Sequence, residues 1–260
     1  MELDSVYFDL DIPYAGKISL RGSRQDNSIV KPIMETGSYE PKLMRLLNDL
    51  LKPGDTFLDL GANIGVMSVA ASYYVGPSGM VIAVEAGKIN FEYLKENMER
   101  RGIENYKLFN CGVWDYETTL KFSYVPQVAG CSFFSTTGIE EGNVEVVQCR
   151  TVDGILSGLN NPHINLTKID VEGAELKALT GMDRTIERCR PNIIFELNNG
   201  TLKRFFDITP EKIWDFFTER GYSLFDFNEG EELLKISTPF EFSNLTSGEK
   251  GWTELLARPC

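Results

Sequence analysis

The stretch from Asp55 to Ser72, "DTFLDLGANIGVMSVAAS", combines a short apolar strand, a glycine turn and a helix of small residues. This order is typical of the first βα unit of a doubly wound α/β sheet, in which the ligand lies beyond the carboxyl end of the strand. A dinucleotide-binding G-x-G-x-x-G loop beginning at Gly61 would need glycine where Asn63 and Val66 stand. The turn also lacks the lysine of a P-loop. The stretch therefore predicts a nucleoside-type cofactor without a pyrophosphate.

Strands and helices alternate through most of the chain. Apolar runs predict the strands, and apolar side chains at helical spacing predict the helices. Near-continuous apolar strands between amphipathic helices predict an α/β fold, with a mostly parallel sheet covered by helices on both faces. The expected strands are 56–60, 81–86, 106–113, 164–170, 192–197 and 222–227, and the expected helices are 41–54, 65–75, 89–102, 174–189 and 210–221.

Three segments depart from this alternation. Residues 1–50 form a lead-in with a short β-rich part, "KISLRG", followed by the start of the first helix. Residues 116–150 hold "TLKFSYV" and "VEVVQCR" around a loop rich in glycine, serine and threonine, which predicts an inserted β-hairpin. The segment "GWTELLARP", 251–259, predicts a last antiparallel edge strand. Because no repeat or linker divides the sequence, residues 1–260 are expected to form a single domain.

Composition excludes several classes of partner. A formal net charge of -12 argues against nucleic acid, because phosphate binding needs clustered lysine and arginine. The apolar runs are far shorter than the ~20 residues that cross a bilayer, and the acidic N-terminus shows no secretory signal. Without a C-x-x-C pair, the cysteines are expected to be reduced thiols in a cytoplasmic protein. They are Cys111, Cys131, Cys149, Cys189 and Cys260.

Carboxylates at the ends of the first two main strands indicate the cofactor. Asp59 ends the first strand, and Glu85 ends the second. S-adenosylmethionine has no phosphate and carries a sulfonium and an ammonium group, both of which carboxylates attract. Glu85 can accept both ribose hydroxyls, as acids at this strand end do in nucleoside sites. A solvated strand-end acid is the alternative for Glu85 taken alone, but with the glycine turn the pattern favours S-adenosylmethionine.

Three motifs resemble those of the FkbM family of S-adenosylmethionine-dependent methyltransferases: "PGDTFLDLGANIG", "LTKIDVEGAELKALTGM" and "RPNIIFEL". The similarity runs from about Gly37 to the C-terminal strand. It implies a class I, Rossmann-like methyltransferase fold with seven strands, the last of them antiparallel. It also implies methyl transfer, usually to oxygen, on natural products, sugars or lipid-linked saccharides. The first 35 residues and the hairpin correspond least, and we expect the substrate to be selected there.

Cofactor-binding residues are expected along five stretches of the chain. "GSYEP" holds Glu40, whose carboxylate the resemblance places at the donor's ammonium, and a helix N-terminal acid is the alternative. "CGVWDYE" holds Trp114 and Asp115, which are expected to border the adenine, and a core tryptophan is the alternative. The expected cofactor-binding residues are Glu40, Asp59, Gly61, Ala62, Asn63, Gly65, Glu85, Ala86, Trp114, Asp115 and Asp170.

The candidate catalytic residues are Asp170, Lys168 and Glu172, at the carboxyl end of the fourth main strand. Lys168 and Asp170 share one face of that strand by its period of two. A lysine in a covered strand needs an acidic partner, and the neighbouring strands offer Asp59 and Glu196. A structural ion pair is the alternative role for Lys168. Asp170 is the expected general base, because a hydroxyl acceptor must lose its proton, and a contact to the donor's amine is the alternative.

Three further groups of residues are weaker candidates. His163, the one histidine, lies directly before the fourth main strand, about 20 Å from the chemistry expected at the other end of that strand, and is expected to be a loop residue. Glu172 and Glu175 could equally cap the following helix. Phe122, Tyr124, Phe133 and Phe134 of the hairpin form either a substrate lid or a packed insertion.

A metal site is a further, weaker possibility. Asp170, Glu196 and Asn198 are oxygen donors at adjacent strand ends, where Mg²⁺ could bind. Leu197 interrupts the acidic pair that metal-dependent O-methyltransferases usually carry, and no metal site is expected.

These observations predict an S-adenosylmethionine-dependent methyltransferase that acts on a hydroxyl of a small molecule, natural product or saccharide. The alternatives are transfer to nitrogen, or a non-catalytic nucleoside-binding protein of the same fold. An NAD-dependent oxidoreductase is disfavoured by Asn63 and Val66.

Overall fold

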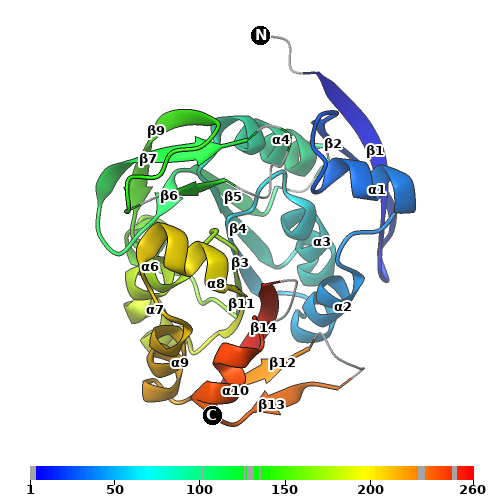
Figure 1. The fold of residues 1–260 in the computed structure, drawn as a ribbon. Coiled ribbons are helices and arrows are strands. Elements are labelled where there is room, and N and C mark those ends of the chain that lie inside the picture. The colour runs from blue at the N-terminus through cyan, green and yellow to red at the C-terminus, as the bar shows by residue number, and fades with distance from the viewer. Residues whose placement is uncertain are drawn as a thin grey trace.

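The computed structural model describes residues 4–100, 102, 104–125, 127, 132–134, 136–227, 232–247 and 251–260. Its centre is an eight-stranded sheet with the order β13-β12-β14-β11-β10-β3-β4-β5 (Figure 1). The strands of this sheet are β3 (Thr56–Leu60), β4 (Met80–Glu85), β5 (Tyr106–Asn110), β10 (Leu166–Ile169), β11 (Asn192–Asn198), β12 (Tyr222–Asp226), β13 (Leu234–Ile236) and β14 (Trp252–Pro259).

The directions of the strands match a doubly wound α/β fold with one reversed strand. The five strands from β11 to β5 run parallel to one another. β14 is antiparallel to both of its neighbours, β11 and β12. The antiparallel strand predicted near the C-terminus is thus present, but it lies inside the sheet and not at its edge. The sheet also has eight strands where seven were expected, because β13 pairs with the outer side of β12.

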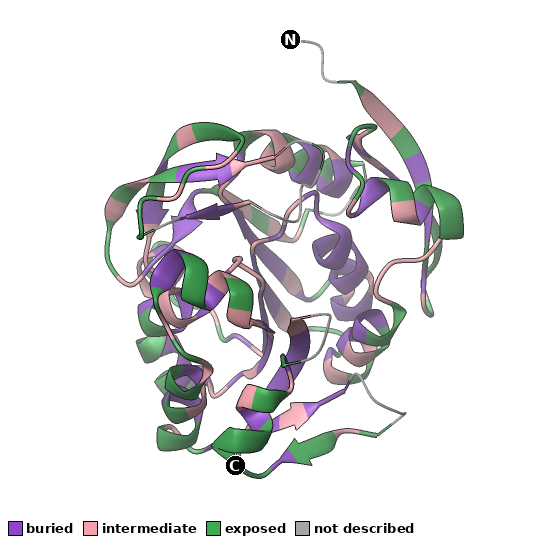
Figure 2. Cartoon of the chain, in the orientation of Figure 1, coloured by how far each residue is buried: buried purple, intermediate pink, exposed green. Residues whose placement is uncertain are grey.

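Helices cover both faces of the sheet, because successive strand residues point to opposite sides. Phe57 lies in one hydrophobic core and Leu58 in the other, and Figure 2 shows the central strands buried between the layers. One face holds α2 (Pro41–Leu50), α3 (Val66–Val75) and α4 (Lys88–Glu99). The other holds α5 (Val152–Ser157), α6 (Glu175–Gly181), α7 (Asp183–Cys189), α9 (Pro210–Glu219) and α10 (Pro239–Asn244).

The lead-in folds against the first of these faces. β1 (Ser5–Ile12) and β2 (Gly16–Ser23) form an antiparallel hairpin, followed by α1 (Val30–Thr36). Alternate apolar residues of the hairpin, such as Leu10 and Leu20, are fully buried in the same hydrophobic core as α3 and α4. In the described part of the chain, no helix is long and apolar enough to cross a membrane.

The segment expected to be a hairpin belongs to a second, four-stranded sheet. β7 (Thr118–Tyr124) and β9 (Asn143–Arg150) pair antiparallel. β6 (Gly112–Val113) adds to β9, and β8 (Phe133–Phe134) adds to β7. The simple hairpin was therefore an incomplete prediction. Residues 126, 128–131 and 135 of this segment, and Cys131 with them, lie outside the described residues.

Two helical segments differ from the expected pattern. The helix predicted over 174–189 is divided into α6 and α7, which meet at Met182. After β11 the chain forms α8 (Asn199–Thr201) and a π-helical turn, Leu202–Phe206, before α9.

Candidate functional site

A cavity of about 880 Å³, counted with its open mouth, lies at the carboxyl ends of β3, β4 and β10. Its place is the one where doubly wound sheets bind ligands. Most of the residues expected at the site from the sequence line this cavity. They are Glu40, Asp59, Gly61, Ala62, Asn63, Glu85, Ala86, Lys168, Asp170 and Glu172.

The turn between β3 and α3 brings its backbone close to the end of β10. Gly61 has φ +81°, and a Cβ there would lie 1.8 Å from the carbonyl oxygen of Asp170. Asn63 has φ +52°, and its Oδ1 accepts a 2.9 Å hydrogen bond from the backbone N of Ile64. Gly65, at φ +90°, begins α3 and packs against α4 instead of lining the cavity. Gly65 therefore shapes the turn, while Gly61 and Asn63 form the cavity wall.

Glu85 joins this turn to the end of β4. Its Oε2 accepts a 2.9 Å hydrogen bond from Asn63 N, and its Oε1 accepts a 2.7 Å bond from Gly87 N. Burial raises the pKa of Glu85 to about 7, although the two backbone bonds act in the opposite direction. Each carboxylate oxygen has a further lone pair. Glu85 can thus still accept hydrogen bonds from the hydroxyls of a ligand.

Lys168 forms an ion pair with Asp170, and not with Asp59 or Glu196 as expected. Its Nζ donates a 2.8 Å hydrogen bond to Asp170 Oδ2. Burial lowers the pKa of Lys168, but the charges of Asp170 and Asp59 raise it more, and the net shift is upward. Lys168 is therefore a charged ammonium group beneath the cavity.

Asp59 lies opposite Lys168 in the pairing of β3 with β10. Its Oδ2 accepts a 2.6 Å hydrogen bond from Ser68 Oγ in α3. Its Oδ1 is buried and has no hydrogen-bond partner among the described residues. Burial raises the pKa of Asp59, which Lys168 and Ser68 partly offset. A buried acceptor without a partner, in the wall of a cavity, is suited to a ligand that carries an N–H donor.

Two further carboxyl groups come together beside Asp170. Glu172 lines the cavity with φ +53°, and Glu196 extends from β11. Burial and then the charge of Glu196 raise the pKa of Glu172 well above its usual value. Burial and then the charge of Asp170 do the same for Glu196, whose Oε1 accepts a 3.2 Å bond from Asn198 Nδ2. Both groups therefore hold protons at a higher pH than exposed glutamates do.

Glu175 fastens the turn that follows β10. Its Oε1 accepts hydrogen bonds of 3.2 Å from Val171 N and 3.1 Å from Gly173 N. The side chain is almost fully buried, and burial raises its pKa to about 7. Glu175 thus holds the backbone that carries Glu172. Its position at the start of α6 fits the helix-capping alternative better than contact with a ligand.

Trp114 and Asp115 lie outside the cavity wall, contrary to expectation. Trp114 is buried in a small aromatic core, where its ring centroid lies 5.9 Å from that of Phe134. Asp115 forms a 2.8 Å ion pair with Lys177. The cavity wall here is made by the preceding residues, 111–113. His163, as expected, is an exposed loop residue before β10.

Three aromatic residues of the inserted sheet, Phe122, Phe133 and Phe134, belong to one packed core, as the packed-insertion alternative predicts. Phe122 and Phe134 also line the cavity, with ring centroids 4.9 Å apart. Phe133 stacks on Phe205, with centroids 3.7 Å apart. One side of the cavity is therefore an apolar wall supplied by this sheet.

Tyr39 lines the cavity beside Glu40, and the sequence reasoning missed it. Burial and then the charges of Glu40 and Asp170 raise the pKa of Tyr39 well above its usual value. Its phenol is therefore a hydrogen-bond donor at neutral pH. Its position within "GSYEP", next to an expected site residue, was the signal available. Glu40 stands at the N-cap position of α2 with φ +40° but makes no side-chain cap bond there.

No metal site is expected from the sequence, and this stays a prediction. Over the described ranges, no group of three or more histidine, cysteine, aspartate or glutamate side chains is arranged to hold a metal. Asn198 Oδ1 accepts bonds from the backbone N of Gly200 and of Thr201. The Mg²⁺ ligand set of Asp170, Glu196 and Asn198 is thus unsupported.

Comparison with known proteins identifies relatives for much of the chain. Methyltransferase 1 of Beauveria bassiana (strain ARSEF 2860) is 25% identical over 164 residues, which are 56% of this chain and 66% of that protein. Methyltransferase sdnD of Sordaria araneosa is 28% identical over 177 residues, covering 55% of this chain and 67% of that protein. The chain spans about two thirds of the length of these two relatives.

A solved structure and a family model also match. The crystal structure of methyltransferase FkbM from Methylobacillus flagellatus KT superimposes on 82% of this chain and 50% of its own, with 16% identity and a TM-score of 0.48. The family model described as "Methyltransferase FkbM domain" matches residues 59–224, from Asp59 in β3 to Leu224 in β12. Since this match covers more than half of the sequence, the chain belongs to the FkbM methyltransferase family.

Proposed function

We propose that this protein transfers the methyl group of S-adenosylmethionine to a hydroxyl of a small molecule, natural product or saccharide. The observation that carries the proposal is the charge of the cavity wall. Lys168 is the one basic residue among the described residues of the wall, and it is already paired with Asp170. The carboxylates of the wall are Glu40, Asp59, Glu85, Asp170 and Glu172.

This wall suits a donor that carries two positive charges and no phosphate. When bound, S-adenosylmethionine supplies a methyl group on a sulfonium, which an acceptor displaces in line. Carboxylates close to a sulfonium and an ammonium stabilise both charges. The Oδ1 atom of Asp59, buried without a partner in the described structure, supports an ammonium contact at the end of β3. Glu40 supplies a second acidic group to the cavity wall.

The nucleoside half of the donor fits the other end. We assign Glu85 to the ribose hydroxyls, because its carboxylate is in the wall and its two backbone bonds fix its orientation. Gly61, Ala62 and Asn63 supply backbone at close range, and Ala86 and residues 111–113 supply the walls beside the base. Phe122 and Phe134 exclude water from that side.

Asp170 is the proposed proton acceptor for the hydroxyl. It lies in the cavity wall with a third of its side chain exposed, and its Oδ2 is held 2.8 Å from Lys168 Nζ. Such help from a positioned base is typically worth about 10²–10⁴ in rate. Glu172 is a second proposed proton acceptor, because the raised pKa of its carboxyl makes it a stronger base than an exposed glutamate.

Transfer to nitrogen is the second candidate, because the same acidic wall would attract an amine. A nucleoside-binding protein without catalysis is the third. The cytoplasmic location, the absence of a nucleic-acid partner and the single-domain organisation stay predictions from the sequence.

Calorimetry tests the donor assignment directly. The wild-type protein should bind S-adenosylmethionine and S-adenosylhomocysteine and show no heat with NAD. Binding to NAD alone would overturn the proposal. Transfer of a labelled methyl group to matched alcohol and amine acceptors then separates the candidates. Label on the alcohol supports transfer to oxygen, and label on the amine supports transfer to nitrogen. Binding of the donor without transfer to any acceptor supports the non-catalytic candidate.

A further inference from the structure

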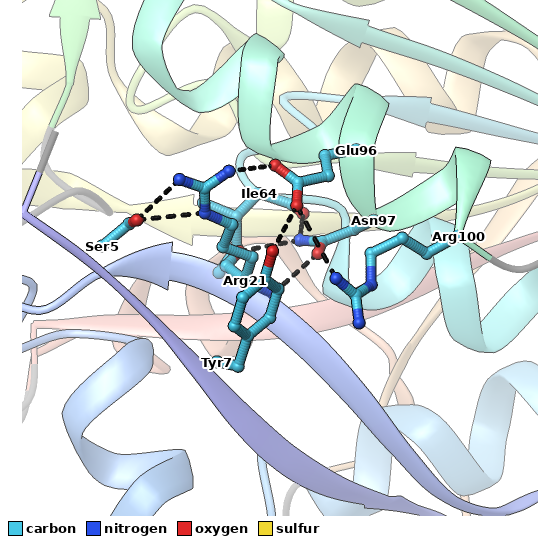
Figure 3. Close-up of polar contacts among 7 residues, drawn as sticks. All are labelled: Ser5, Tyr7, Arg21, Ile64, Glu96, Asn97 and Arg100. Carbon is cyan, nitrogen blue, oxygen red and sulfur yellow. Dashed lines mark hydrogen bonds and ion pairs between the residues drawn. The ribbon is translucent and has the colours of Figure 1, made fainter. Parts of the chain in front are cut away.

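One buried side chain connects the cofactor-side turn to the N-terminal hairpin. Asn97, on α4, is 1% exposed. Its Oδ1 accepts a 2.7 Å hydrogen bond from Arg21 N, and its Nδ2 donates bonds of 2.9 Å to Arg21 O and 2.8 Å to Ile64 O (Figure 3). Asn97 thus pairs with both backbone groups of Arg21 in β2 and with the carbonyl group of the turn. The side-chain amide makes every bond that its two hydrogens allow.

The residue that Asn97 holds is part of the cavity-forming turn. Ile64 lies between Asn63 and Gly65, which both have positive φ. Residues in this sparsely populated region persist only where their surroundings fix them. The backbone N of Asn63 is bonded to Glu85. A shift of the turn at Ile64 would therefore be transmitted to Asn63 and to its bond with the proposed ribose ligand.

The hairpin also packs on the turn directly. A Cβ on Gly22 of β2 would lie 3.3 Å from Cδ1 of Ile64 and 2.6 Å from Cγ2 of Val30. Glycine at this position lets β2 approach both side chains closely. The hydrogen bonds of Asn97 and this apolar contact act on the same residue of the turn.

A second set of contacts joins the hairpin to α4 without reaching the turn. Glu96 accepts a 2.9 Å hydrogen bond from the phenol of Tyr7 and forms ion pairs with Arg21 and Arg100. Ser5 Oγ accepts two bonds from the Arg21 guanidinium. These groups are partly exposed and lie beside Asn97 in Figure 3. They offer a control, because they tie the same two elements and leave Ile64 untouched.

We propose that Asn97 is a positioning residue through which the β1–β2 hairpin and α4 hold the turn 61–65 in its cofactor-binding shape. The expected change in affinity for S-adenosylmethionine rests on the proposed function. Replacing the amide leaves the carbonyl of Ile64 buried without a donor, which a turn can relieve only by moving. The hairpin is then a component of the cofactor site, although the cavity wall contains none of its described strand residues.

Two Asn97 variants and a control test the proposal. Asn97→Leu removes all three hydrogen bonds at similar volume, and Asn97→Asp keeps the acceptor for Arg21 N but places an oxygen against two carbonyls. Glu96→Ala weakens the neighbouring contacts between the hairpin and α4. Each variant is compared with wild type by near-UV circular dichroism, by the dissociation constant for S-adenosylmethionine, and by hydrogen exchange of the amides of residues 61–66 without ligand.

We expect both Asn97 variants to keep the near-UV spectrum, to bind S-adenosylmethionine about tenfold more weakly, and to exchange the turn amides faster. Glu96→Ala should lower the melting temperature with donor affinity and turn exchange unchanged. Wild-type exchange in a folded Asn97 variant, or equal acceleration by Glu96→Ala, would overturn the proposal. If wild type itself fails to bind the donor, the proposed function fails, and the exchange measurement still decides whether Asn97 holds the turn. Should Asn97→Leu not fold, Asn97→Asp carries the test.

Discussion

Lys168 and Asp170 form an ion pair at the carboxyl end of β10, with Nζ 2.8 Å from Oδ2. The lysine side chain is 5% exposed and the aspartate side chain 34% exposed. The carboxylate therefore meets the cavity while the ammonium lies beneath it. The lysine thus places a positive charge against an aspartate in a wall whose other ionisable groups are acidic. This relation sets the first two predictions.

Asp170→Asn should reduce turnover by about 10²–10⁴ and change donor affinity much less. The substitution keeps the shape of the side chain but removes its charge and most of its basicity. Steady-state kinetics together with calorimetry measure the two effects. Asp115→Asn is the matched control, because Asp115 also pairs with a lysine at 2.8 Å but lies outside the cavity wall. If donor affinity falls in step with turnover, Asp170 is a cofactor ligand and the base must be another residue.

Lys168→Met should destabilise the fold by about 1.5–3 kcal/mol, because Asp170, which is only partly exposed, loses its charged hydrogen-bond partner. The double variant Lys168→Met/Asp170→Asn should be more stable than the sum of the single effects predicts. Urea unfolding of the four proteins in this cycle measures the coupling. Additive effects would show that the ion pair contributes nothing to stability.

Glu85→Ala should weaken binding of S-adenosylmethionine about tenfold to a hundredfold, because two ribose hydroxyls lose their acceptor. Calorimetry measures the change. Glu241→Ala is the control: Glu241 also accepts bonds from two backbone amides, those of Ser237 and Thr238, but it does so at the start of α10. An unchanged dissociation constant in Glu85→Ala would remove Glu85 from the site.

Stability should fall as pH rises from about 4.5 to about 7. Burial raises the pKa of Glu85 and of Glu175 from 4.5 to about 7 in the folded protein. Between these values the folded state binds more protons than the unfolded state, so unfolding becomes easier as pH rises. Each group contributes on the order of 3 kcal/mol across the window. Glu175→Gln should flatten the curve of unfolding free energy against pH, and an unaltered slope would contradict the assignment.

Gly61→Ala should abolish donor binding and destabilise the protein, because the new Cβ would lie 1.8 Å from the carbonyl oxygen of Asp170. Gly16→Ala isolates the cost of backbone conformation alone. Gly16 has a similar φ, +86°, but has no atom within 4 Å of the new Cβ. That control should cost about 1 kcal/mol. Equal melting temperatures for the two variants would mean that the protein relieves the close contact at residue 61 without loss of stability.

The sequence predicts the site best where the fold dictates positions. The ends of parallel strands meet at one edge of a sheet, so Asp59, Glu85 and Asp170 could be brought together from strand order alone. The pairing partner of Lys168 could not be predicted in this way. Strand register places Asp59 opposite it, but Ser68 occupies one oxygen of Asp59, and the long lysine side chain turns along its own strand to Asp170.

Strand order and periodicity do not predict irregular segments, nor contacts between residues that are distant in the sequence. Trp114 follows a strand of only two residues, so no periodicity indicates which way it points, and the small core of the inserted sheet buries it. Asn97 reads as one polar residue among many on an amphipathic helix. Its partners, Arg21 and Ile64, come from segments that sequence spacing does not relate to α4.

The position of β14 has a consequence for how the chain folds during its synthesis. β14 follows β12 and β13 in the chain but lies between β11 and β12 in the sheet. Until the ribosome has released β14, the β12–β13 pair has no partner in the sheet and β11 presents an open edge. The strands that carry the cavity, β3, β4 and β10, are all made earlier and can pair without it. The nascent chain can thus assemble its ligand-binding half first, and β14 then joins the β12–β13 pair to it.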